Sequence, residues 1–281
     1  MDFRFTQDQQ NLIDAAKAFF DGENTVERMR AMAKGEKVSD LWPKFEELGL
    51  LDLMKSEQDG GLEQPLVVMV GIAEAASYAG LPEPFIEVAA IQTKGTSLRP
   101  YPNSYLEDGE PVRSIDPLRK LVKCETDKSP NELAEHHGAV LTAAQLIGLS
   151  KRMLDMSVDY AKDRQQFGKP IGTFQAIKHQ LANVHTQIDF TRPIIQLAAI
   201  KGGATVHNAK VSAIDTAMLA AETAIQVHGG MGYTYEVDLH FFMKRAWALC
   251  GEWGDRNYHM KKLEDYVFAD DTELGAGTTF G

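Results

Sequence analysis

The strongest pattern in the sequence is a helical one that fills its C-terminal half. From Ala139 onward, apolar side chains return every three to four residues, which is the spacing of one face of an α-helix. The pattern predicts helices over 139–164, 173–191, 204–227, 238–248 and 255–268. Pro193 lacks an N–H group and has a fixed φ angle, so we expect the second helix to kink or end near Thr191. Long antiparallel helices make a four-helix bundle, and the fold is predicted to be mainly α.

The N-terminal 90 residues contain shorter helical patterns. Thr6 and Gln9 have the spacing of a capping box, and an apolar stripe follows them. The next two predicted helices, each followed by a glycine stop, are 40–48 with Gly49 and 67–79 with Gly80. Leu48 is expected to face the interior. Together these segments predict a small helical domain.

Residues 91–130 interrupt the helical pattern. They hold five of the chain's eleven prolines and few periodic apolar residues. Short strands are expected near 112–115 and 121–124, but a segment of this composition cannot bury a large core of its own. It is either a connector with a stub of sheet or a long ordered loop laid over the helices. The predicted divisions are a helical domain at 1–90, a truncated β-domain or connector at 91–130, the bundle at 131–268 and a loose tail at 269–281.

Composition excludes several classes of function. The 281-residue chain is 44% hydrophobic, enough for a sizeable core, and it combines a net charge of −11 with the absence of any basic block. Nucleic acids and anionic membrane surfaces are therefore not expected partners. The sequence shows no signal-peptide pattern and no apolar stretch as long as a membrane-spanning helix. We therefore expect a soluble cytoplasmic protein.

The cysteines and histidines do not indicate a metal site. Cys124 and Cys250 have no CxxC partner, and so few cysteines fit a reducing compartment. His136 and His137 are adjacent and cannot share one helix face. The same lack of a suitable spacing applies to His179, His185, His228 and His240. All are expected to be core or surface residues.

A compact turn between two predicted helices is the first candidate site. One helical pattern stops at Arg164 and the next opens at Thr173, whose hydroxyl group is expected to cap the second helix. Glycine and proline residues lie between them, at Gly168, Pro170 and Gly172. We call residues 164–175 the helix corner.

The helix corner combines side chains that suit a flat anionic ligand. A guanidinium fork, amides and an aromatic ring lie beside a helix N-terminus, a combination that can bind a dinucleotide pyrophosphate. These side chains belong to Arg164, Gln166, Phe167 and Gln175. The alternative is purely structural: Phe167 and Ile171 would fill the core while Arg164 is solvated.

The second candidate is the stretch from Gln226 to Tyr233, Gln-Val-His-Gly-Gly-Met-Gly-Tyr. Its glycines end a helix and would let the backbone approach a ligand closely. It is not a Rossmann-type dinucleotide fingerprint, because the glycines follow a helix instead of a strand. A turn that only caps the helix is the alternative.

Taken together, the two stretches resemble the acyl-CoA dehydrogenase family. The residues that carry the resemblance are Arg164-Gln-Gln-Phe-Gly-Lys-Pro-Ile171, Phe174-Gln175 and the stretch from Gln226 to Tyr233. The resemblance covers 131–268 and is weaker over the N-terminal helices, where Leu41-Trp42 and Glu47-Leu48-Gly49-Leu50 precede Gly60-Gly61. It implies an N-terminal helical domain, a central β-domain and a C-terminal four-helix bundle, with FAD bound across a subunit interface.

The resemblance also implies which residues reach the cofactor. In the family, the two turns contact the adenosine diphosphate half of an FAD that the neighbouring subunit holds. Carried over, the cofactor-binding residues are Arg164, Gln166, Phe167, Ile171, Phe174, Gln175, Gln226, Val227, Gly229 and Gly230. The chemistry agrees, because a guanidinium group donates to pyrophosphate and glycines open the backbone.

The chain departs from the family where the flavin ring and the catalytic base are expected. A full-length member has a complete β-domain, for which only residues 91–130 are available here. The glutamate that abstracts the α-proton would align with Gly254 or with Gly138, and glycine cannot accept a proton. The nearest carboxylates are those of Glu252, Asp255 and Glu135. A shift of one or two helix positions turns a side chain by about 100° or 200°, so we assign no catalytic residue.

These departures resemble the short subunit without a base found in heteromeric acyl-CoA dehydrogenases. In such complexes a full-length subunit supplies the β-domain and the base, so we expect an α2β2 heterotetramer that shares FAD with this chain and dehydrogenates an acyl-CoA thioester. By analogy, the acyl group is a steroid side chain and the electron acceptor an electron-transfer flavoprotein or a similar protein. Two alternatives remain open: a self-sufficient homomeric flavoenzyme with an unconventional base, and a flavin-free scaffold protein.

Overall fold

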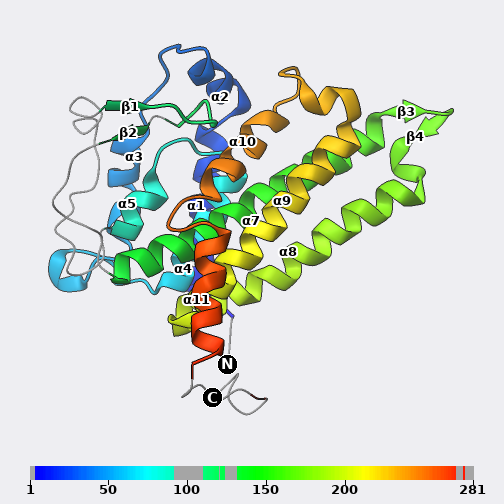
Figure 1. Cartoon of the computed structure of the whole chain (residues 1–281). Helices are drawn as coiled ribbons and strands as arrows, with labels where there is room; N and C mark the ends of the chain where they lie inside the picture. The colour runs from blue at the N-terminus through cyan, green and yellow to red at the C-terminus, as the bar shows by residue number, and fades with distance from the viewer. Residues whose placement is uncertain (1–3, 92–109, 120, 124–131, 270–274, 276–281) are drawn as a thin grey trace.

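Long helices make up the C-terminal half of the molecule. The computed structural model describes residues 4–91, 110–119, 121–123, 132–269 and 275. The helices α7 (Glu132–Asp163), α8 (Gln175–Lys201) and α9 (Ala204–His228) lie side by side, and α10 (Leu239–Leu249) and α11 (Arg256–Val267) complete the bundle (Figure 1). The predicted mainly α fold is confirmed. The last three helices agree with their predicted bounds to within one residue.

Helix α7 is the central element of the fold. Every residue from Gly138 to Ser150 is buried, so this stretch is covered on all sides and not along a single stripe. Part of the cover is α4 (Leu66–Tyr78) from the N-terminal half. The two helices approach closely because position 148 is glycine: a Cβ there would lie 2.2 Å from the carbonyl oxygen of Glu74. One continuous apolar core therefore joins both halves of the chain.

The N-terminal half contains more helices than its pattern predicts. Thr6 and Gln9 form the predicted capping box at the start of α1 (Gln7–Glu23). Glycines with positive φ follow α3 (Trp42–Glu47) and α4, as predicted. The prediction for Leu48 was wrong: this residue is the C-cap of α3 and is 52% exposed. The elements not predicted are α2 (Val26–Ala33), α5 (Phe85–Ile91) and the short 3₁₀ turns η1 (Leu50–Asp52) and η2 (Glu57–Asp59).

The described part of the middle segment is a small ladder attached to the bundle. Strands β1 (Glu110–Val112) and β2 (Leu121–Lys123) pair in antiparallel fashion, and β1 starts two residues before the predicted strand. The buried carboxylate of Asp116 forms an ion pair with Arg245 of α10, which fixes this segment to the bundle. The predictions for 92–109 and 124–130 and for nearly all of the tail lie outside the described residues.

The prediction that the second bundle helix ends near Thr191 was wrong, because α8 continues through Pro193 to Lys201. Proline leaves the carbonyl group of Asp189 without its helical hydrogen bond, and Asp189 is exposed, so water can satisfy that group. On the inner face, Ile188 and Ile195 are buried on either side of the proline. Packing against the bundle therefore holds the helix together across the missing bond.

Candidate functional site

The helix corner is a hairpin that extends from the end of α7. Strand β3 (Gln165–Gln166) pairs with β4 (Lys169–Pro170), and the connecting residues Phe167 and Gly168 have φ angles of 54° and 79°. Two consecutive positive φ angles form the tight turn whose twist matches paired strands. The predicted turn is therefore present, although its hairpin form was not predicted.

The hairpin presents the ring of Phe167 to solvent. This side chain is 90% exposed, and its ring lies edge-on to that of Phe174 with 6.0 Å between the centroids. The ammonium group of Lys169 lies 4.5 Å from the centroid of the Phe174 ring. The alternative in which Phe167 fills the core is wrong, and Ile171 is only half-buried. An aromatic ring held in solvent by a tight turn is typical of a contact surface.

The N-terminus of α8 carries no side-chain cap, and the prediction that Thr173 caps it was wrong. Thr173 belongs to the 3₁₀ turn η3 (Ile171–Thr173), and its hydroxyl group donates to the carbonyl group of Pro170 at 2.7 Å. Phe174 occupies the N-cap position, and its side chain cannot accept a hydrogen bond. N–H groups of the first turn of α8 are therefore available to an anionic ligand beside the exposed Gln175.

The glycine turn begins where α9 ends and continues as the 3₁₀ turn η4 (Gly229–Tyr233). Gly229 has a φ angle of 58°, and a Cβ at Gly229 or Gly230 would meet no atom within 4 Å. Another molecule can therefore approach this backbone closely. Gln226 is exposed, whereas the side chain of Val227 is 4% exposed and packs into the bundle, so only its backbone can face a ligand.

The two turns lie at the same end of the bundle. Near the end of α7, the ring of Tyr160 stacks on that of His228, the last residue of α9, with 4.4 Å between the centroids. The stack brings the helix end that leads into Arg164 next to the one that leads into Gly229 (Figure 1). Arg164 and Gln166 are exposed and Phe174 is half-buried. The structure therefore brings the predicted cofactor-binding residues to one end of the molecule.

The two expected base positions lie near the opposite end of α7, and both are closed to a larger side chain. A Cβ on Gly138 would lie 2.3 Å from the indole ring of Trp253. Gly254 has a φ angle of 99°, and its Cβ would lie 2.4 Å from the ring of Tyr258. A glutamate at either position would have to displace an aromatic side chain.

The three neighbouring carboxylates have other contacts or lie in solvent. Glu252 forms an ion pair with Arg119, and burial raises the pKa of its carboxyl group. Asp255 accepts a hydrogen bond of 2.8 Å from the backbone N–H of Tyr258 and so caps α11. Glu135 is exposed on α7.

A buried lysine holds the loop that carries Trp253 and Gly254. Lys210 of α9 has no exposed surface, and its ammonium group donates to the carbonyl groups of Leu249, Glu252 and Gly254 at 3.3, 2.6 and 3.1 Å. Burial lowers the pKa of Lys210 to about 8. Three hydrogen bonds from Lys210 thus fix the loop conformation that closes the base positions.

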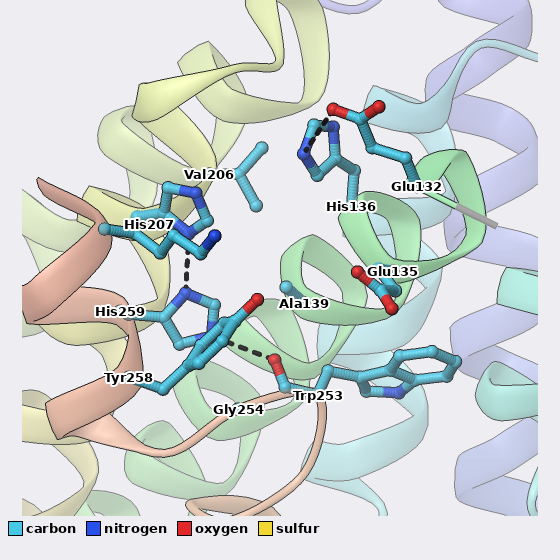
Figure 2. A pocket seen from close by; sticks show the side chains of 11 residues that line it. Glu132, Glu135, His136, Ala139, Val206, His207, Trp253, Gly254, Tyr258 and His259 are labelled. Carbon is cyan, nitrogen blue, oxygen red and sulfur yellow. Dashed lines mark hydrogen bonds and ion pairs between the residues drawn. The ribbon is translucent and has the colours of Figure 1, made fainter. Parts of the chain in front are cut away.

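Beside the closed base positions lies a cavity of about 490 Å³, between α7, the start of α9 and α11 (Figure 2). Three histidines line it: His136, His207 and His259. Sequence analysis did not single out His207 or His259, because they lie on different helices and have no recognisable spacing. Within the described residues, no three His, Cys, Asp or Glu side chains converge as metal ligands.

Two family models match the chain on either side of the middle segment. The model for the N-terminal domain of acyl-CoA dehydrogenase matches residues 6–96, and the model for the C-terminal domain matches residues 134–262. The chain belongs to the acyl-CoA dehydrogenase family. The resemblance seen in the sequence is thereby confirmed. Between the two matches, the β1–β2 ladder is the only sheet among the described residues.

The chain is also similar in sequence to individual acyl-CoA dehydrogenases. The acyl-CoA dehydrogenase IpdE2 of Mycobacterium tuberculosis is 37% identical over 142 residues, which are 49% of this chain and 45% of the relative. The chain spans about half the length of two IpdE2 relatives, 45% and 53%, and 24% of the acyl-CoA dehydrogenase FadE34 of Mycobacterium tuberculosis.

Solved structures share the fold at low sequence identity. A chain of the ChsE4-ChsE5 complex from Mycobacterium tuberculosis has a TM-score of 0.80 at 18% identity, with 98% of this chain and 100% of that chain covered. A chain of the Tcur3481-Tcur3483 steroid ACAD G363A variant has a TM-score of 0.80 at 20% identity, with 93% and 98% covered. These similarities extend the shared architecture over nearly the whole of this chain.

FAD is the cofactor of the acyl-CoA dehydrogenase family. The guanidinium group of Arg164, the uncapped N–H groups of α8 and the bare backbone at Gly229 suit a pyrophosphate. The described residues of the middle segment include no aromatic side chain that could pack on a flavin ring. No described helix combines the length and apolar composition that crossing a membrane requires.

Proposed function

We propose that this chain is the non-catalytic subunit of a FAD-dependent acyl-CoA dehydrogenase. In this proposal it contributes the adenosine diphosphate half of the cofactor site to a full-length partner, which supplies the β-domain and the base. The observation that carries the proposal is a contrast between the two ends of α7. The helix corner at one end is open and rich in hydrogen-bond donors, whereas both base positions, near the other end, are closed. We call the residues at the open end the flavin half-site: Arg164, Gln166, Phe167, Ile171, Phe174, Gln175, Gln226, Val227, Gly229 and Gly230.

Each part of the flavin half-site has a distinct task. Arg164 offers a two-pronged donor that neutralises pyrophosphate charge, and the first turn of α8 adds backbone N–H groups. Gly229 and Gly230 admit the cofactor close to the backbone, and the exposed ring of Phe167 covers a flat surface of the cofactor or of the partner. Bound FAD supplies the hydride acceptor for α,β-dehydrogenation of an acyl-CoA thioester. This chain's residues position and shield that cofactor.

The assembly in this proposal is an α2β2 heterotetramer. Support comes from the solved neighbours, two of which carry paired names, ChsE4-ChsE5 and Tcur3481-Tcur3483. The second of these is described as a steroid ACAD, which supports a steroid side-chain CoA thioester as substrate. An electron-transfer flavoprotein or a similar protein would reoxidise the flavin.

Co-expression tests the division of labour. The chain is expressed alone and together with full-length acyl-CoA dehydrogenases of the same organism, and bound FAD is counted per chain. We expect a colourless protein from the chain alone and a yellow complex with one FAD for each pair of subunits. A yellow, active protein from this chain alone, or the failure of any stable complex to form, would contradict the proposal.

Arg164→Ala tests the half-site directly. Loss of a charge-assisted contact to phosphate costs about 1.5–3 kcal/mol, so the complex should retain FAD about ten- to a hundredfold more weakly. Lys162→Ala is the matched control. Lys162 lies in the last turn of α7, close to Arg164, and its side chain is 68% exposed, so the substitution removes a nearby cation. Equal FAD retention by the two variants would favour the alternative of a flavin-free scaffold.

A self-sufficient homomeric flavoenzyme that uses Glu252 as its base is the second candidate. It is favoured by the raised pKa of Glu252 and by its Oε2 atom, which is buried without a hydrogen-bond partner among the described residues. Glu252→Gln would then abolish turnover while FAD stays bound. Unchanged turnover removes this candidate.

A further inference from the structure

A pair of histidines joins α9 to α11 inside the cavity near the closed base positions. The Nδ1 atoms of His207 and His259 lie 2.8 Å apart, which Figure 2 shows as a dashed line. The Nε2 atom of His259 lies 3.0 Å from the backbone carbonyl oxygen of Trp253. His259 is 2% exposed, whereas His207 is half-buried and lines the cavity.

These contacts fix the position of the protons on both rings. A carbonyl group only accepts, so Nε2 of His259 carries the hydrogen that it donates to Trp253. Burial lowers the pKa of His259 to about 4, so the ring is neutral near pH 7 and its Nδ1 atom is an acceptor. His207 must therefore donate from its own Nδ1 atom.

The remaining nitrogen of His207 is an acceptor. Burial also lowers the pKa of His207, so its ring is neutral as well and its Nε2 atom carries a lone pair. No described residue forms a hydrogen bond with this atom. The relay from the Trp253 carbonyl group through His259 to His207 thus ends in an acceptor on a residue that lines the cavity.

The rest of the lining favours a ring without negative charge. Trp253 and Tyr258 supply aromatic surface, and Ala139 and Val206 supply apolar surface. Two carboxylates, those of Glu132 and Glu135, oppose the single lysine, Lys262, in this lining. An anion is therefore disfavoured by the local charge.

We propose that this cavity binds an uncharged ring compound that carries a hydroxyl group, with Nε2 of His207 accepting the hydroxyl hydrogen and Trp253 and Tyr258 contacting the ring. The site is independent of the flavin half-site. Helix α7 separates them: from Ala139 to its end at Asp163 it rises about 36 Å.

Binding of 2-naphthol to the full-length chain tests this proposal by isothermal titration calorimetry. The comparison probe is 2-methoxynaphthalene, which has the same ring system but no donor hydrogen. One neutral hydrogen bond contributes about 1 kcal/mol, so 2-naphthol should bind about fivefold more tightly. The anion 2-naphthoate should bind more weakly than either.

Variants locate the preference at His207. His207→Phe should abolish the discrimination between the two probes, and His259→Phe should weaken it because the relay no longer sets the tautomer of His207. His207→Gln keeps an acceptor and should keep part of the preference, which separates loss of the acceptor from loss of folding. His179→Phe, at an exposed position of α8, is the matched control and should behave like the unmodified chain. Absence of 2-naphthol binding, equal binding of both probes, or discrimination that survives in His207→Phe would overturn the proposal.

Discussion

The contact between Gly138 and Trp253 gives the sharpest test of how the base position is closed. Replacing a helical glycine by alanine normally stabilises a protein by about 0.5–1 kcal/mol, because the unfolded chain loses freedom. At Gly138 the new Cβ would lie 2.3 Å from two atoms of the Trp253 indole ring. Carbon atoms in contact prefer about 3.5–4.0 Å, so the ring would have to move by more than about 1 Å.

The indole ring is not free to move away at no cost. Trp253 has a φ angle of 53°, a conformation that is unfavourable for a residue with a side chain, and Lys210 holds the carbonyl groups on both sides of it. Overpacking of this kind costs about 1–3 kcal/mol. We therefore expect Gly138→Ala to lower the free energy of unfolding by about 1–2 kcal/mol, the propensity gain included.

Urea unfolding followed by far-UV circular dichroism measures the effect. Gly22→Ala in α1 is the matched control, because a Cβ there meets nothing within 4 Å, and it should raise stability by about 0.5–1 kcal/mol. In a Trp253→Leu background the indole ring no longer meets the Cβ at position 138. Gly138→Ala should then be stabilising, as Gly22→Ala is. If Gly138→Ala stabilises the unmodified chain as Gly22→Ala does, the reasoning that the indole ring seals this position is refuted.

Three further predictions follow from other contacts. Arg245→Met leaves the buried carboxylate of Asp116 without its cation and should destabilise the fold by about 3–5 kcal/mol in urea unfolding, most of it recovered on adding Asp116→Leu. Pro193→Ala should raise stability by about 1–3 kcal/mol by restoring a hydrogen bond in α8, and an unchanged melting temperature would contradict this. Burial lowers the pKa of His137 and of His259 from 6.5 to about 4, so the unfolded chain binds these protons at higher pH than the folded one. The contribution of these two histidines to the free energy of unfolding is at its maximum above about pH 6.5. It is lost as the pH falls toward 4, by up to about 3 kcal/mol for His259. The urea midpoint should decrease as the pH is lowered through this range, and it should decrease less steeply in His259→Gln.

The sequence alone determined the elements that depend on neighbouring residues. The periodic apolar positions after Ala139 indicated the bundle helices, although the first of them begins seven residues earlier, at Glu132. Thr6 and Gln9 indicated the first helix start, because caps are set by residues three or four apart. The two glycine-containing turns also indicated the family, since their residue types and order can be read from the sequence without knowing the fold.

Only the tertiary structure decided the features that depend on distant contacts. Helix α8 continues past Pro193 because buried residues on both sides of it pack against the bundle, which outweighs a local preference for ending. The exposure of Phe167 follows from a hairpin turn with two positive φ angles, which Gly168 alone does not specify. The closed base positions and the His207–His259 pair join residues far apart in the chain, and no spacing in the sequence encodes such meetings. They arise because the bundle brings α7, α9 and α11 together around one cavity.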